Sequence, residues 1–133
     1  MTASLTRRAE LAVAAQPHVA LLAARLRCFG GTVVPANEER LGFILRAGRI
    51  RAPTRIDVRR GDSSAQVNSA LLWESNPDLG LVIGWALGSD DAWRRHAWCE
   101  DRTVLIETTD AQRMYFGARL SPAESCDFAF MTL

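Results

Sequence analysis

The feature that most constrains this 133-residue sequence is a predicted β-hairpin in residues 92–109, which read AWRRHAWCEDRTVLIETT. The Val-Leu-Ile run at 104–106 is rich in strand formers, and a Gly-Ser-Asp-Asp cluster precedes the segment. We therefore expect two antiparallel strands joined by a two-residue loop at Asp101 and Arg102. The other elements must pair with this hairpin or cover it.

The hairpin also predicts a chemical pair. With that loop, His96 lies directly opposite Glu107, with Cβ atoms roughly 5 Å apart. A carboxylate in this position fixes the tautomer of an imidazole and stabilises its charged form, so that the other ring nitrogen can transfer protons. A loop longer or shorter by one residue would turn one side chain away. The structural alternatives are a core His96 bonded to a backbone carbonyl and a surface Glu107 paired with Arg94.

The first 60 residues predict helices and then short strands. Residues 6–15 and 18–27 have helix formers, and the second segment has an amphipathic face. Residues 32–40 contain Pro and Asn and predict a loop. Residues 41–60 alternate apolar and polar side chains and predict two or three short strands.

The middle and the end of the chain continue this mixture. Ser63 or Ser64 is expected to cap a helix that ends at Asn76-Pro77, and residues 79–87 predict a buried strand. Residues 113–120 predict a further strand, and the capping box at 121–124 begins a terminal helix. The predicted fold class is α+β, with helices packed against an antiparallel sheet of five or six strands.

Composition narrows the function classes. A chain of this length with 48% hydrophobic residues suits one domain spanning residues 1–133. Its 16 basic and 15 acidic residues leave a net charge of +1, so a nucleic-acid partner is not expected. All 16 basic residues are arginine, which indicates a GC-rich and bacterial genome. The sequence contains no apolar run long enough for a membrane span, so a cytoplasmic location is expected.

The cysteines do not predict a metal site. Cys28, Cys99 and Cys126 form no CxxC pair, and three is an odd number for a disulfide framework. No cofactor is expected.

Several short motifs between residues 61 and 120 resemble a family of small uncharacterised bacterial proteins. Members of that family read C-H-x-N at a helix start, G-Y-A-L on a strand, then W-R-x-H-S-W, E-T-T and Y-F-G. The matching residues here are Asn68, Gly84-Trp85-Ala86-Leu87, Trp93-Arg94-Arg95-His96-Ala97-Trp98, Glu107-Thr108-Thr109 and Tyr115-Phe116-Gly117. More distantly, the order of helix and strands is similar to that of papain-like and transglutaminase-like cysteine enzymes, which implies a core of that kind.

One position departs from the resemblance. Counting back from Asn68, the cysteine of the family falls on Ala65 and its histidine on Gln66. A helix start lowers the pKa of a thiol, and a methyl group cannot replace that nucleophile. Ala65 is either an engineered knock-out or a natural loss. A serine at 63 or 64 is a third option, although a hydroxyl there is expected to cap the helix.

The resemblance implies a thiol-dependent amide hydrolase or acyltransferase acting on an amide-like or peptide-like substrate. Residue 65, as Cys, would be the nucleophile, His96 the base and Glu107 the orienting group. Gln66 and Asn68 could offer amide donors to an oxyanion or simply cap and pack, and Trp93 and Trp98 could line a pocket or the core. With Ala65 the chain is inactive by this mechanism. The alternative is a catalytically inactive module of the same fold that binds a peptide or a small molecule.

Overall fold

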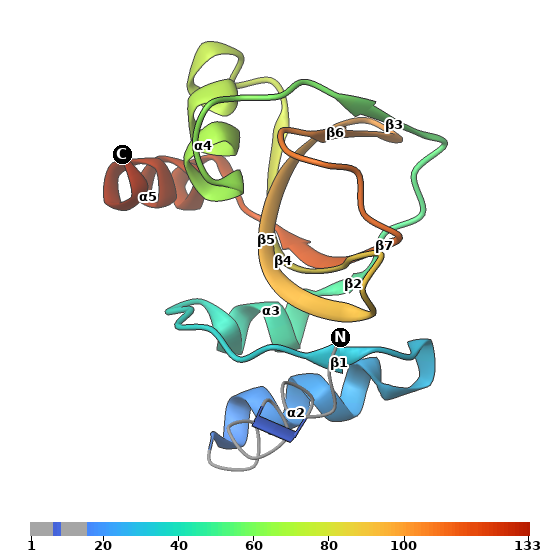
Figure 1. Ribbon diagram of the computed structural model, residues 1–133. Coiled ribbons are helices and arrows are strands. Elements are labelled where there is room, and N and C mark those ends of the chain that lie inside the picture. The colour runs from blue at the N-terminus through green and yellow to red at the C-terminus, as the bar shows by residue number, and fades with distance from the viewer. Residues whose placement is uncertain (1–6, 9–15) are drawn as a thin grey trace.

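The computed structural model describes residues 7–8 and 16–133 (Figure 1). The helix expected over residues 6–15 lies outside the described residues, apart from Arg7 and Arg8, which are helical. The described elements, in chain order, are α2 (Pro17–Leu26), the 3-10 turn η1 (Arg27–Phe29), β1 (Thr32–Val33), α3 (Leu41–Ala47), β2 (Arg49–Ile50), β3 (Arg55–Val58), α4 (Ala65–Ser75), β4 (Gly80–Leu87), β5 (Ala92–Asp101), β6 (Val104–Glu107), β7 (Met114–Arg119) and α5 (Pro122–Thr132).

The sheet is curled so that its two edges approach each other. Its main strand order is β2-β7-β4-β5-β6-β3, yet only residues 51–54 connect β2 to β3. A flat sheet would separate these edge strands by about 24 Å, whereas so short a link spans at most about 18 Å. Figure 1 accordingly shows β5 curving between β3 and β6 at the top and β7 and β2 at the bottom.

The α+β class is confirmed, and the expectation of an antiparallel sheet was wrong. Within the described residues the sheet has seven strands, and it is mixed because β3 pairs with β6 in parallel and β1 pairs with β5 in parallel. β1 also lies within the segment that was expected to be a loop. The strands of each parallel pair lie far apart in the chain, so no short turn motif in the sequence could predict their pairing.

Residues 41–47 form helix α3 where a strand was expected. Leu41 and Ile44 are buried three positions apart, which places them on one face of a helix. In so short a segment, helical and alternating spacing are hard to distinguish. Arg25 of α2 stabilises the end of α3 by donating to the carbonyl oxygens of Leu45 and Gly48.

Other expectations from the sequence are confirmed. Ser64 caps α4, its hydroxyl accepting from the backbone N–H of Val67 at 3.2 Å, and Asn76 ends the helix. β4, β5, β6 and β7 lie where strands were expected, and α5 begins with the capping box of Ser121 and Glu124.

The two faces of the curled sheet have different neighbours. The concave face holds a small cluster of Val82, Ala86, Trp98, Leu105 and Tyr115, with Ile56 packed against it. The convex face and the four described α-helices share the larger core, which includes Ala97, Cys99 and Ile106. Along β5, even-numbered side chains therefore face the concave side, and odd-numbered ones face the helices.

Candidate functional site

The hairpin forms, with a register two residues from the expected one. β5 and β6 pair Cys99 with Ile106, so Trp98, rather than His96, lies level with Glu107. The loop is Arg102 and Thr103, with Arg102 in the left-handed region at φ +55°. Because side chains alternate with a period of two, a shift of two residues leaves His96 and Glu107 on the same face.

Glu107 is the centre of a buried hydrogen-bond network. His96 Nε2 lies 2.8 and 3.0 Å from the two carboxylate oxygens, and Tyr115 Oη donates to Oε1 at 2.8 Å. The backbone N–H and the hydroxyl of Thr109 both donate to Oε2 at 3.0 Å. Tyr115 in turn accepts the backbone N–H of Gln112 at 2.9 Å. Glu107 is fully buried, and its carboxylate is satisfied by these donors.

This environment keeps Glu107 ionised and Tyr115 protonated. Burial by itself would raise the pKa of Glu107, but the hydrogen bonds and charge of His96, together with the Thr109 and Tyr115 donors, outweigh it and lower the pKa. Burial raises the pKa of Tyr115, and the neighbouring Glu107 charge raises it further. The phenol therefore acts as a donor to the carboxylate.

His96 has a second ring nitrogen that Glu107 does not bind. Nδ1 forms no hydrogen bond with another described residue, and the His96 side chain is 11% exposed. The rings of Trp98 and Tyr115 flank the imidazole at centroid distances of 6.1 and 6.2 Å. With Nε2 held by Glu107, Nδ1 is the nitrogen that could exchange a proton with a ligand.

Ala65 belongs to a helix on the other side of the sheet. It is the first residue of α4 and is 7% exposed. α4 packs against the convex face of β5, where Cys99 Sγ donates to the Ser69 carbonyl at 3.5 Å. Burial raises the pKa of Cys99 to about 12, so this thiol stays protonated. The structure thus brings His96 and Glu107 together and places Ala65 on the helix covering the opposite face.

The two amide side chains proposed for an oxyanion lie at the start of α4. Asn68 is buried, and its Nδ2 donates to the carbonyls of Ser63 at 2.9 Å and Thr108 at 3.2 Å. Its Oδ1 accepts the backbone N–H of Ser63 at 3.0 Å. Asn68 therefore ties the loop before α4 to the end of β6. Gln66 is half-buried in the first turn of the helix.

The two tryptophans proposed as pocket walls are fully buried. Trp93 donates its indole N–H to the carbonyl of Gly30 at 2.8 Å and belongs to the larger core. Trp98 lies on the concave face, stacks edge-on to Tyr115 and donates to Glu100 Oε2 at 3.2 Å. Both side chains pack within the protein.

Sequence reasoning missed the partners of Glu107 and a second buried carboxylate. Tyr115 and Thr109 lie in the Y-F-G and E-T-T motifs, which were a usable signal. Glu100 is bound by Arg51 through two bonds, Nε to Oε2 at 2.9 Å and Nη2 to Oε1 at 2.6 Å. These two residues are 49 positions apart, and no local pattern connects them.

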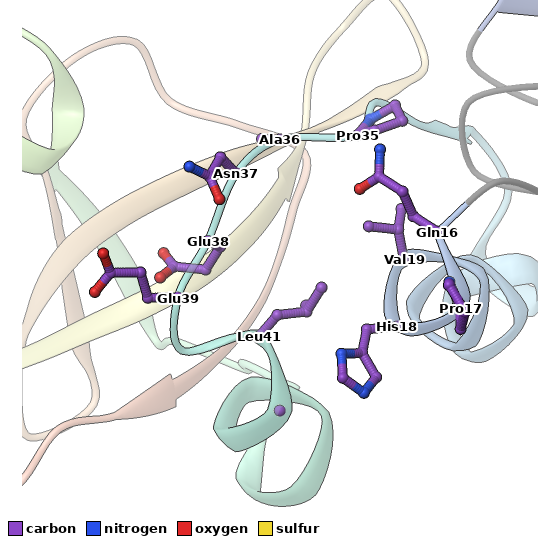
Figure 2. Close-up of a pocket in the computed structure, with 11 residues that line it drawn as sticks. Gln16, Pro17, His18, Val19, Pro35, Ala36, Asn37, Glu38, Glu39 and Leu41 are labelled. Atoms are coloured by element: carbon purple, nitrogen blue, oxygen red, sulfur yellow. The ribbon is translucent and has the colours of Figure 1, made fainter.

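A separate pocket of about 710 Å³ lies between the start of α2 and the segment leading into α3 (Figure 2). In the close-up, the carboxylates of Glu38 and Glu39 point away from His18 and Gln16. Glu38 is already bound by Arg95 Nε at 2.9 Å and by the backbone N–H of Arg40 at 3.0 Å. The pocket is lined by Gln16, Pro17, His18, Val19, Pro35, Ala36, Asn37, Glu38, Glu39, Leu41 and Gly42.

Comparison with known proteins gives no family, since no protein-family model, curated protein or solved structure matches the chain significantly. Within residues 7–8 and 16–133, no three His, Cys, Asp or Glu side chains are grouped so that they could hold a metal ion. Of the helices that the structure describes, none has both the length and the apolar character needed to span a membrane.

Proposed function

We propose that this chain, as it stands, is a non-catalytic module that binds a peptide or a small amide. The observation that carries the proposal is that no thiol lies beside His96 among residues 7–8 and 16–133. Ala65 offers a methyl group, Cys99 is a buried thiol on the convex face, and Cys28 and Cys126 are exposed on other elements. A His–Glu pair without a thiol nucleophile supports ligand binding rather than acyl transfer.

The pocket beside α2 supports a binding role. Its volume of about 710 Å³ falls in the range of sites for small molecules and short peptides, about 300–1,000 Å³. Val19, Leu41 and Pro35 give it apolar walls, while Gln16 and Asn37 bring amide groups that can pair with a peptide group. We assign the ligand to this pocket.

Gly42 provides a direct test of that assignment. A Cβ built at this glycine meets no atom within 4 Å, so a side chain there starts in open space. We expect Gly42→Trp to fold and to fill the mouth of the pocket. Gly42→Ala, the matched control, should leave the pocket open and add helix propensity to α3.

The measurement is a chemical-shift titration with N-acetylated peptide amides. Wild-type protein and Gly42→Ala should show shifts at Asn37 and Leu41, and Gly42→Trp should lose them. Absence of shifts in all three proteins, or equal binding by Gly42→Trp, would remove this pocket as the binding site.

The second candidate is a thiol hydrolase or acyltransferase whose nucleophile has been replaced. It is favoured by one observation, the 2.8 Å contact of His96 Nε2 with a buried carboxylate, which leaves Nδ1 available for proton transfer. In that case Ala65→Cys would create a thiol whose pKa is lowered by the helix start.

Alkylation of Ala65→Cys by iodoacetamide distinguishes the two candidates. The native Cys126, exposed on α5, is an internal reference thiol. Under the binding proposal, the new thiol reacts no faster than Cys126 below pH 7. Faster alkylation that is lost in an Ala65→Cys/His96→Gln variant would favour the enzyme instead.

A further inference from the structure

We infer that a second pocket, on the concave side of the sheet, binds a small oxyanion such as a carboxylate or a phosphate group. It lies where β2 ends and faces the loop between β5 and β6, and its volume is about 250 Å³. Its wall includes Arg49, Arg51, Pro53, Glu100, Arg102 and Thr103. The site is distinct from the pocket beside α2 and from the His96 network.

Arg51 is a pre-positioned guanidinium in this wall. The N–H of its backbone donates to the Tyr115 carbonyl at 2.8 Å, and its side chain forms a two-bond fork with Glu100. Arg51 and Glu100 side chains are 13% and 9% exposed. The indole N–H of Trp98 donates at 3.2 Å to Glu100 Oε2, the oxygen that also accepts from Arg51 Nε, so both members of the pair are fixed in place.

One edge of the Arg51 guanidinium is left for a ligand. The fork uses Nε and Nη2, and Nη1 forms no hydrogen bond with another described residue. The Arg51 side chain is 13% exposed, so solvent reaches part of it. Arg51 lines the pocket, and a fixed guanidinium edge matches the paired oxygens of a carboxylate or phosphate.

The charge around the pocket favours an anion. Three arginines and one glutamate line it, and Glu100 is already committed to Arg51. Arg49 and Arg102 are exposed and form no ion pair with any other residue that the structure describes. The hydroxyl of Thr103 and the pocket volume suit a group of a few heavy atoms. An oxyanion would therefore meet one arginine held in place by Glu100 and two exposed ones.

The inference is tested by titrating the whole chain with inorganic phosphate and, separately, with acetate. The backbone N–H signals of Ala52, Arg102 and Thr103 should shift, with saturation in the millimolar range, near about 1–10 mM. Tighter binding of phosphate would indicate a phosphate-bearing ligand, and tighter binding of acetate a carboxylate. No shift at these residues by about 50 mM of either anion would overturn the inference.

The decisive variant is Arg49→Ala/Arg102→Ala, which leaves the buried Arg51–Glu100 pair intact. We expect at least about tenfold weaker binding, because two charge-assisted contacts are removed. Arg60→Ala/Arg113→Ala is the matched control, since it removes the same charge at exposed sites away from the pocket. An equal loss in both variants would show a general charge effect and would overturn the site.

Discussion

The concave face of the sheet holds two buried glutamates that are neutralised in different ways. Glu107 is fully buried and is bound by His96, Tyr115 and Thr109. Glu100 is 7% exposed and is bound by the fork of Arg51 and by the indole of Trp98. Both carboxylates therefore have complete hydrogen bonding, but only one has a permanent positive charge beside it.

The two glutamates therefore differ in the kind of partner that holds them. An arginine stays charged at any working pH, so the Arg51–Glu100 pair is a fixed cross-link between the end of β2 and β5. The partners of Glu107 are an imidazole, a phenol and the two donors of Thr109, and none of them carries a permanent charge. The same concave face thus contains an ion pair at one end of the curl and a carboxylate held by a hydrogen-bond network further along β5.

The largest effect is expected from breaking the fixed pair. Arg51→Met leaves the Glu100 carboxylate buried without a counter-charge, which costs about 3–5 kcal/mol of unfolding free energy. Urea denaturation measures this loss. Arg51→Met/Glu100→Leu should recover much of the stability, because a hydrophobic pair can replace a buried ion pair. Arg60→Ala, which breaks an exposed pair with Asp110, is the control and should have no measurable effect.

A smaller effect is expected at the other glutamate. Glu107→Gln keeps the shape of the side chain, but its amide N–H₂ would face donors that need an acceptor. We therefore expect the free energy of unfolding to fall by about 1–3 kcal/mol. Circular dichroism should show an unchanged fold. A loss as large as that of Arg51→Met would mean that the two carboxylates contribute to stability in the same way.

The pH dependence of stability sharpens the contrast. The pKa of Glu107 is lower in the folded protein than its ordinary value of 4.5, so the unfolded chain binds the proton more readily. Its stabilising contribution is present above pH 4.5 and is lost as the pH falls through the lowered folded value. The stability curves of wild type and Glu107→Gln should therefore converge in acid. Parallel curves would contradict the lowered pKa.

The sequence predicted the parts of the fold that have local signals. The cap at Ser64, the capping box at Ser121 and the hairpin follow from short-range chemistry. The His96–Glu107 pair survived an error in register because the error was two residues, which preserves the face of the strand.

The features of the fold that could not be predicted from the sequence depend on contacts between residues far apart in the chain. The parallel pairing of β3 with β6 and the Arg51–Glu100 fork join residues about 50 positions apart. Helix α3 was predicted as a strand because helical and alternating spacing are hard to distinguish in a segment of seven residues. The curl of the sheet, which encloses both glutamates, follows from the short link between its edge strands and becomes evident only when the strand order is known.

The smallest effect that distinguishes the two carboxylates concerns Tyr115. Tyr115→Phe removes one of the donors to Glu107 and the acceptor of the Gln112 N–H. Because His96 and Thr109 still bind Glu107, we expect the free energy of unfolding to fall by only about 1–2 kcal/mol. A double-mutant cycle with Glu107→Gln isolates the pair and should give a coupling of at least about 0.5 kcal/mol. The same cycle between Tyr115→Phe and Arg51→Met/Glu100→Leu serves as the comparison and should give a smaller coupling, because the two side-chain sites meet only through Trp98. Coupling of equal size in both cycles would mean that the two glutamates belong to one network, and the separation between an ion pair and a hydrogen-bonded carboxylate would no longer hold.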